Sequence, residues 1–403
     1  MATLIIVLAI AAIFYLFIPG IGAFHSRRGW RLFRKRIIAA SQFPFVSYRD
    51  IHSVNKDCIG HFRFLGNLQA MAGEHLIWLG DGRLTLSADL KNVVVHLLPS
   101  EQSPSEMNSG SDAGGYAGSL LPDETVRSVR WETLSSLPEG TRFFVAGPLF
   151  NDNGRAVFRS TTETPLVVVI SDWTDRELLP VAIWMGRQRN EYWNRMTPAS
   201  LAVGFLWQMI LSYSYLREPL QRIPAIFSLT TSLAPLAIFL PPGLLFFSLY
   251  RYFWKKGRVS RGERDIALLP LRYFGNMPVS DAGKRGTLPD GGTYSVAVFR
   301  SREEALGAVE TAEDVSVPDI TCKSGNRNEI QWFLFGEKKE SGLFAAPRDP
   351  MAELCLFAGN PLELSRKCAL RARKMELLSA ASFALAFGIN TFLLLYILAR
   401  IIR

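Results

Sequence analysis

Cys58 and His61 are a close pair in the sequence whose side chains could serve as a nucleophile and its base. Both lie in CIGHFRFLGNL, residues 58–68, which we predict to be a β-strand. Residues three apart in a strand point to opposite faces, so the two side chains would not meet locally. The spacing therefore favours a small buried cysteine and a surface histidine over a catalytic pair.

Metal-ligand and cofactor motifs are equally scarce. The four cysteines are Cys58, Cys322, Cys355 and Cys368. They lie too far apart for a metal-binding pattern such as C-x-x-C. The histidines form no H-E-x-x-H pattern. Residues 151–154, NDNG, lack the leading Asp and closing Glu of a calcium-binding loop. Residues 288–295, LPDGGTYS, are rich in glycine but lack the G-x-x-x-x-G-K-S/T pattern of a phosphate-binding loop. Both predict turns. The sequence predicts no catalytic residue, no metal site and no cofactor.

Positive charge is concentrated in three short windows. Residues 25–45, 251–264 and 366–374 together hold seventeen Arg or Lys and one acid, a net +16. The whole chain carries +9, so the remainder sums to −7. Each window adjoins an uncharged apolar run, which favours cations lying against anionic lipid headgroups. The predicted membrane-surface residues are Arg27, Arg28, Arg31, Arg34, Lys35, Arg36, Arg251, Lys255, Lys256, Arg258, Arg366, Lys367, Arg371, Arg373 and Lys374.

Those apolar runs are long enough for transmembrane helices. Residues 2–24 and 377–399 contain no charge, and each can cover a hydrocarbon core of about 30 Å. The first run is followed, not preceded, by its basic cluster, which favours an uncleaved anchor over a signal peptide. Residues 223–250 are also uncharged, but their four prolines predict a kinked or broken helix.

Residues 198–216 leave two interpretations open. Gln208 and three serines weaken the apolar run, while Thr197 and Pro198 suit a helix start. The segment is either a further transmembrane helix or an amphipathic helix lying on the bilayer surface.

Topology follows if each basic cluster stays on the cytoplasmic side. All three clusters can lie on the cytoplasmic side only if the chain crosses the membrane an even number of times between residues 36 and 251. The apolar runs 198–216 and 223–250 supply two crossings. We therefore expect a multi-pass protein of the plasma or inner membrane with both termini outside. The large segments 37–197 and 265–376 would face the cytoplasm.

The first of these segments, residues 37–197, carries strong strand signals. Gly80-Asp81-Gly82 and Asn153-Gly154 are tight-turn signals between β-rich runs. Residues 99–122 are rich in Ser, Gly and Pro, and we expect a flexible loop there. The run CIGHFRFLGNL partly resembles EGTRFFVAGPL, residues 139–149, which leaves an internal duplication open. The strand–glycine–hairpin pattern suits a small closed barrel such as an OB-fold.

A resemblance to a known family rests on one stretch within this segment. LSSLPEGTRFFVAGPLF, residues 134–150, lies in a β-domain between an N-terminal anchor and a later span. This arrangement resembles the membrane-side domain of GIDE-type membrane E3 ubiquitin ligases and their prokaryotic relatives. Those ligases end in a RING domain with paired Cys and His zinc ligands, which this sequence lacks. The resemblance therefore implies a membrane-side β-domain without ligase activity.

The second segment, residues 265–376, predicts a small α+β domain. Strand signals in GGTYSVAVFRS and EIQWFLFGEKK flank a helical run, REEALGAVETAED. Asn360, Pro361 and Glu363 form a helix start, and no later proline stops the helix before residue 399.

Taken together, the sequence predicts a multi-span α-helical membrane protein with a β-rich, OB-like domain and a small α+β domain. The favoured function is a membrane-anchored interaction or scaffold protein that presents two cytoplasmic domains to a partner, which we expect to be another protein. One alternative is a non-catalytic subunit or regulator of a membrane enzyme complex. A transporter is disfavoured because the spans lack interior charges. A nucleic-acid partner is disfavoured because the basic clusters adjoin the spans.

Overall fold

The computed structural model describes residues 2–52, 57–99, 125–134, 137–152, 154–188, 190–275, 284–318, 320–322 and 331–401. Almost all of the predicted loop 99–122 lies outside the described residues. The chain divides into two compact units. A helical unit comprises Met1–Leu32, Arg189–Arg258 and Leu370–Arg403, and a β unit comprises Phe33–Gln188 and Val259–Ala369.

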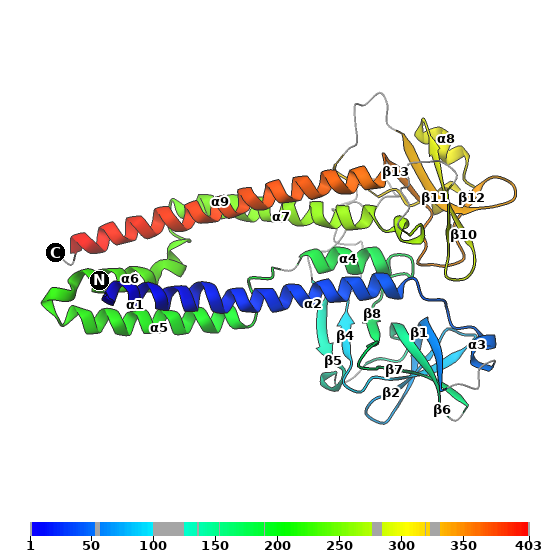
Figure 1. Cartoon of the computed structure of the whole chain (residues 1–403), viewed down its shortest axis with the longest axis horizontal. Helices are drawn as coiled ribbons and strands as arrows, with labels where there is room; N and C mark the ends of the chain where they lie inside the picture. Colours follow the sequence, from blue (N-terminus) through cyan, green and yellow to red (C-terminus); the bar gives the residue numbers. More distant parts are fainter. Residues whose placement is uncertain are drawn as a thin grey trace. The chain divides into compact units, whose positions relative to one another are not determined.

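Long helices build the helical unit (Figure 1). They are α1 (Ala2–Ala12), the π-helical turn η1 (Ile13–Phe17), α2 (Ile18–Ala40), α5 (Met196–Leu216), α6 (Arg222–Ala237), α7 (Gly243–Ala267) and α9 (Pro361–Ile401), with a 3-10 turn η4 (Pro219–Gln221) between α5 and α6. Within the described residues, three helices are long and apolar enough to cross a membrane: Ala2–Ala40, Met196–Leu216 and Pro361–Ile401. The first continues well beyond the predicted span 2–24. The helix predicted from Pro361 is confirmed as one unbroken α9.

The polarity of α5 is the reverse of that in a water-soluble helix. Its buried residues are Thr197, Ser200, Gly204, Gln208 and Ser212, which are all polar or small. Large apolar residues face outwards instead, among them Leu206, Trp207 and Ile210, which are between 50% and 58% exposed. This pattern suits a helix surrounded by lipid and packed through small and polar residues. It favours a transmembrane α5 over an amphipathic helix on the bilayer surface, because the latter buries its apolar face in the membrane and exposes its polar face.

Gln208 joins three helices through its side-chain amide. Its Nε2 donates to the Val7 carbonyl oxygen of α1 at 2.8 Å, and its Oε1 accepts from the Ser228 hydroxyl of α6 at 2.8 Å. Ser212 donates to the Ala225 carbonyl oxygen of α6 at 3.1 Å. Two of the polar residues that weaken the sequence signal of this helix, Gln208 and Ser212, therefore hydrogen-bond to α1 and α6.

The π-helical turn in the first helix also has a sequence cause and side-chain partners. Pro19 has no N–H with which to bond the Tyr15 carbonyl four residues earlier, and its ring crowds that carbonyl. The Tyr15 carbonyl accepts from the Tyr192 hydroxyl at 2.6 Å, and the Phe14 carbonyl accepts from the Ser200 hydroxyl at 2.5 Å. Gly204 leaves room here, because a Cβ on it would collide with Phe14 and Tyr15.

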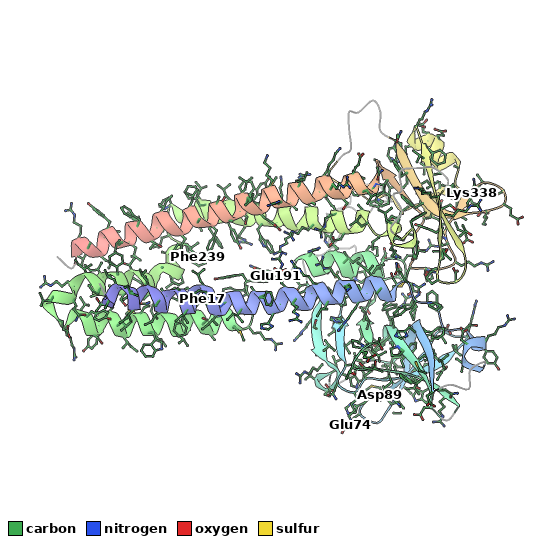
Figure 2. The ribbon with its side chains drawn as sticks, in the orientation of Figure 1. Phe17, Glu74, Asp89, Glu191, Phe239 and Lys338 are labelled. Atoms are coloured by element: carbon green, nitrogen blue, oxygen red, sulfur yellow. The ribbon has the colours of Figure 1, made fainter. Side chains whose placement is uncertain are left out.

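The predicted third span is divided. Pro241 would collide with the carbonyl of Ala237 if the helix continued, so α6 ends at Ala237 and α7 begins after Pro242. Phe239 lies in this break (Figure 2). Neither half is among the three helices that are long and apolar enough to cross on their own. The prolines therefore produce a complete break in the helix.

Asn390 connects α9 to the break between α6 and α7. Its Nδ2 donates to the carbonyl oxygens of Ala237 and Leu240, both at 2.6 Å. Gly243 admits this approach, since a Cβ on it would overlap the Asn390 amide. With Ser379, Ser382 and Ala386, Asn390 forms the buried stripe of α9.

The β unit contains a ring of strands (Figure 1). Its elements are α3 (Tyr48–His52), β1 (Cys58–Ala72), β2 (Leu76–Gly80), β3 (Thr85–Asp89), β4 (Val94–Leu97), β5 (Arg127–Arg130), η3 (Trp131–Thr133), β6 (Arg142–Asp152), β7 (Arg155–Arg159), β8 (Val167–Ile170) and α4 (Leu178–Gln188). Described strands pair in the order β1-β2-β3-β7-β6-β8-β4-β5, and β1 also pairs with β6. Strands β1, β2, β3, β7 and β6 thus close on themselves. The ring surrounds a core that includes Phe64, Ile77, Leu86, Phe143 and Phe158.

Two features of the ring match the predicted hairpins. Strands β2 and β3 pair across Gly80 and Thr85, and β6 and β7 pair across Asp152 and Arg155. Strands β1 and β6, which carry the two similar sequence runs, are direct antiparallel neighbours, with Phe62 opposite Gly147.

Two expectations for this segment are corrected. Cys58, predicted to be buried, is exposed, because it is the first residue of β1 and precedes an irregularity in the pairing with β6. The segment also contains α4, whose residues 178–187 are all buried. Its continuous apolar run gave no helical period in the sequence.

A second sheet forms from the later part of the chain. Its elements are η5 (Pro270–Tyr273), β9 (Arg285–Thr287), β10 (Thr293–Phe299), α8 (Arg302–Gly307), η6 (Ala312–Asp314), β11 (Trp332–Lys338), β12 (Phe344–Ala345) and β13 (Cys355–Ala358). Described strands pair in the order β12-β11-β10-β9, and β13 also pairs with β11. One apolar cluster joins Tyr294 and Phe335 to Leu364 of α9, and another joins Leu334 and Leu356 to Ala305 of α8. This sheet with helices on it is the predicted α+β arrangement.

Both sheets belong to one compact unit, although the sequence suggests two domains. Arg63 of β1 and Asp349, in the loop before β13, form an ion pair whose two side chains are fully buried. The Arg63 guanidinium also lies 4.2 Å from the Phe45 ring centroid, and Asp349 accepts from the Met351 N–H at 2.9 Å. Removing one partner of such a pair leaves a buried charge without compensation.

Replacing the Asn390 side chain should loosen the helical unit. Asn390→Ala removes both hydrogen bonds to the break, and we expect a loss of about 1 kcal/mol in the free energy of unfolding. Phe392→Ala on the same helix is the control, because Phe392 is 73% exposed. Titration with sodium dodecyl sulfate in mixed micelles measures both. Equal effects of the two substitutions would show that the Asn390 contacts contribute nothing specific.

The buried ion pair gives a second prediction. Asp349→Ala should destabilise the β unit by about 3–5 kcal/mol, because Arg63 keeps its charge in an apolar setting. Combining it with Arg63→Met should restore much of the loss, measured by pulse proteolysis in urea on the solubilised chain. The matched control is Asp314→Ala, which breaks the exposed Arg176–Asp314 pair of 3.1 Å and should cost about 0–1 kcal/mol. A double variant no more stable than Asp349→Ala would refute this account.

Candidate functional site

The first basic cluster is divided between exposed cations and internal ion pairs. Arg28, Arg31, Lys35 and Arg36 are exposed. Arg27 is 44% exposed, and its Nε lies 3.8 Å from a carboxylate oxygen of Glu191 (Figure 2). These exposed cations are therefore accessible, as the prediction of a membrane-surface cluster requires.

Arg34 has a different environment from its neighbours. Its Nη1 donates to an Asp265 oxygen at 2.8 Å, and its side chain is only 14% exposed. Arg187 of α4 donates to the same carboxylate at 2.7 Å, and Arg264 donates to its other oxygen at 2.6 Å. Three guanidinium groups therefore surround Asp265. Arg34 holds α2 against α7 within the β unit.

The second and third clusters are mostly exposed. Arg251, Lys255 and Lys256 are exposed on α7, and Arg366, Lys367, Arg373 and Lys374 are exposed on α9, where Arg371 is half-buried. Lys256 lies 4.4 Å from the Tyr252 ring centroid, and Arg258 lies 5.2 Å from that of Trp254. Arg258 also lies 3.7 Å from Glu191. Cations beside Tyr and Trp rings are typical of helix ends at a membrane–water interface.

A polar cleft of about 360 Å³ opens at one end of the strand ring. It lies where β1, the β2–β3 turn, the start of β6 and the segment after β8 meet. Its lining includes Asn67, Asp81, Arg142, Trp173 and Asp175. The volume falls within the range of about 300–1,000 Å³ common for ligand sites.

Arg142 is the charged centre of this cleft. Its Nη2 donates to Asp175 at 3.0 Å, and its Nη1 donates to the Trp173 carbonyl oxygen at 3.3 Å. The ion pair is accessible, with 42% of the Arg142 side chain and 34% of the Asp175 side chain exposed. Such a pair can exchange partners with polar groups of a ligand. The cleft is therefore suited to binding and holds no nucleophile–base pair among its lining residues.

A smaller cavity of about 120 Å³ lies beside β4 and contains His96. The His96 ring centroid is 4.0 Å from that of Phe33, and Nδ1 lies 3.1 Å from the Ser128 hydroxyl. Burial and the positive charge of Arg36 lower the pKa of His96 to about 4. The imidazole is therefore neutral near pH 7, and it packs as an aromatic ring.

Three potential metal ligands meet elsewhere in the β unit. Glu263 of α7, Cys322 and Cys368 of α9 are all buried, and their ligand atoms lie within 4.8 Å of one another. The Cys368 sulfur is 3.7 Å from a Glu263 carboxylate oxygen. The sequence predicts no such cluster, because the three residues come from distant segments without a local motif. The other cysteines lie apart, Cys58 on β1 and Cys355 beside the Tyr294 hydroxyl at 3.8 Å.

Comparisons with known proteins give no further assignment of these sites. No family model, no curated protein and no solved structure matches the chain.

Proposed function

We propose that this chain is a multi-pass membrane protein that binds a partner protein through its β unit on the cytoplasmic side. The observation that carries the proposal is the inverted polarity of the helical unit. Large apolar side chains face outwards on α5, while serines, Gln208 and Asn390 face inwards on α5, α6 and α9. Lipid, unlike water, favours this arrangement.

Four crossings are consistent with this polarity. The first helix, α5 and α9 supply three. The fourth is α6 together with the first turns of α7, which the break at residues 238–242 divides. A broken helix is acceptable at membrane depth where other protein groups contact its free backbone, as Asn390 does. The exposed cations of the three basic clusters support a cytoplasmic β unit.

We further propose that the strand ring is an OB-type barrel. In chain order its five strands are β1, β2, β3, β6 and β7, and the parallel pair joins the third to the fifth. This order and the long first strand, shared between two neighbours, are those of the OB fold. Many OB barrels bind nucleic acids, but residues 57–99 and 125–175 hold eight Arg or Lys and ten Asp or Glu. A slightly acidic barrel does not favour a phosphate backbone.

The polar cleft is the proposed contact for the partner. Arg142, Asp175 and Asn67 offer donors and acceptors at its lining. We expect a polar loop or extended segment of another protein to bind there, because an accessible ion pair can be replaced by hydrogen bonds from main-chain groups at little cost.

The orientation can be tested with a natural thiol. Cys58 is exposed, whereas Cys322, Cys355 and Cys368 are buried. A membrane-impermeant maleimide should leave Cys58 unmodified in intact spheroplasts and modify it after lysis. The positive control is Leu220→Cys in a Cys58→Ser background, since Leu220 is fully exposed between α5 and α6 and should react in intact spheroplasts. The opposite labelling of the two positions would overturn the orientation.

Partner binding can be tested at the cleft. A photo-crosslinking residue at position 67 should join the chain to a partner protein in living cells. The same residue at Glu163, exposed and outside the cleft lining, is the control. Arg142→Ala should reduce the crosslink at position 67 by about tenfold if the guanidinium contributes a charged hydrogen bond. A crosslink that survives Arg142→Ala unchanged, or that also forms at position 163, would place the interface elsewhere.

A further inference from the structure

We propose that Glu263, Cys322 and Cys368 form a binding site for one divalent metal ion of the zinc class. The three side chains are between 0% and 8% exposed, and their ligand atoms lie within 4.8 Å of one another. Two sulfur ligands and one carboxylate are donors that Zn²⁺ accepts, and thiolates disfavour Mg²⁺ and Ca²⁺.

The ligand spacing agrees with a shared metal ion. Two ligands of a tetrahedral Zn²⁺, one sulfur at about 2.3 Å and one oxygen at about 2.0–2.2 Å from the ion, lie about 3.5–3.7 Å apart. The distance from the Cys368 sulfur to the Glu263 carboxylate oxygen is 3.7 Å. The three side chains could therefore hold the ion with only small adjustments. A water molecule would complete a tetrahedral set.

Thr321 orients the carboxylate ligand. Its hydroxyl lies 2.8 Å and 3.1 Å from the two oxygens of Glu263, and its backbone N–H donates to the nearer oxygen at 3.3 Å. Outer hydrogen bonds of this kind fix the direction of a ligand and commonly accompany metal sites. Thr321 is also the residue before Cys322, so the same turn of chain supplies one ligand and orients another.

The site would join three separate segments of the β unit. Glu263 comes from α7, Cys368 from the first turns of α9, and Cys322 from the chain between η6 and β11. A bound cation would offset part of the free-energy cost of burying the Glu263 carboxylate. A disulfide between Cys322 and Cys368 would use the two sulfurs but not the carboxylate, whereas a metal ion would use all three side chains.

Metal binding can be tested on the full chain in detergent, purified without chelators. Elemental mass spectrometry should find about one Zn²⁺ per chain. After metal removal, Co²⁺ should bind and give the thiolate-to-cobalt charge-transfer absorption. Cys322→Ser and Cys368→Ser should each weaken that absorption, because each variant keeps only one of the two thiolates, and Glu263→Gln should lower Co²⁺ affinity about tenfold or more. Cys58→Ser is the matched control and should bind like the unchanged chain.

Several results would overturn the proposal. The unchanged chain provides the test that does not depend on the folding of a variant. If it contains no zinc and gives no charge-transfer absorption with Co²⁺, the site does not bind such metals. If peptide mapping of freshly isolated protein finds Cys322 joined to Cys368, the pair is a redox disulfide. Absorption of unchanged intensity in both cysteine variants would place the metal elsewhere. None of these results bears on the orientation or the cleft, which the preceding experiments test separately.

Discussion

In the membrane-spanning arrangement proposed above, every polar backbone group at membrane depth needs a partner inside the protein, and several contacts of the helical unit meet this requirement. Pro19 in the first helix and Pro241 after α6 are two of the prolines that disturb backbone hydrogen bonding. At both places a side chain from another helix or segment contacts the affected carbonyls. Tyr192 bonds the Tyr15 carbonyl, and Asn390 bonds those of Ala237 and Leu240.

The same requirement explains which residues are buried. Burying leucine stabilises helix packing in water but not in lipid. In the proposed membrane arrangement, close packing and hydrogen bonds must therefore hold the helices together. Gln208, at 0% exposure, bonds both α1 and α6, and Gly204 lets the first helix approach α5. The β unit solves a different problem. It buries apolar residues in its cores and joins its two sheets through the Arg63–Asp349 ion pair. Ion pairs at Asp265 join α2 and α4 to α7.

Local features of this fold could be predicted from the sequence, and long-range pairings could not. Asn360 and Pro361 mark the start of α9 because cap and first-turn preferences act within a few residues. Gly80 and Gly82 mark a hairpin for the same reason. The pairing of β1 with β6, in contrast, depends on packing between strands far apart in the chain. Helix α4 was missed because a fully buried helix shows no polar face, so its period is hidden. The arginines predicted to lie at the membrane surface illustrate a further limit, since composition could not distinguish Arg34, bound to Asp265, from its exposed neighbours.

The cluster of Glu263, Cys322 and Cys368 arises from the same long-range packing, and its place in the chain gives it a physical consequence. Helix α7 passes from the helical unit into the β unit after residue 258, and α9 passes from the β unit into the helical unit at residue 370. Glu263 and Cys368 lie within a few residues of those two positions. A metal ion between them would restrain both helices close to where each enters or leaves the β unit, as the Arg34–Asp265–Arg187 contacts restrain α2 and α4 against α7. Because α2, α7 and α9 are continuous helices, restraints at these positions would oppose local unfolding of the helix ends that belong to the β unit.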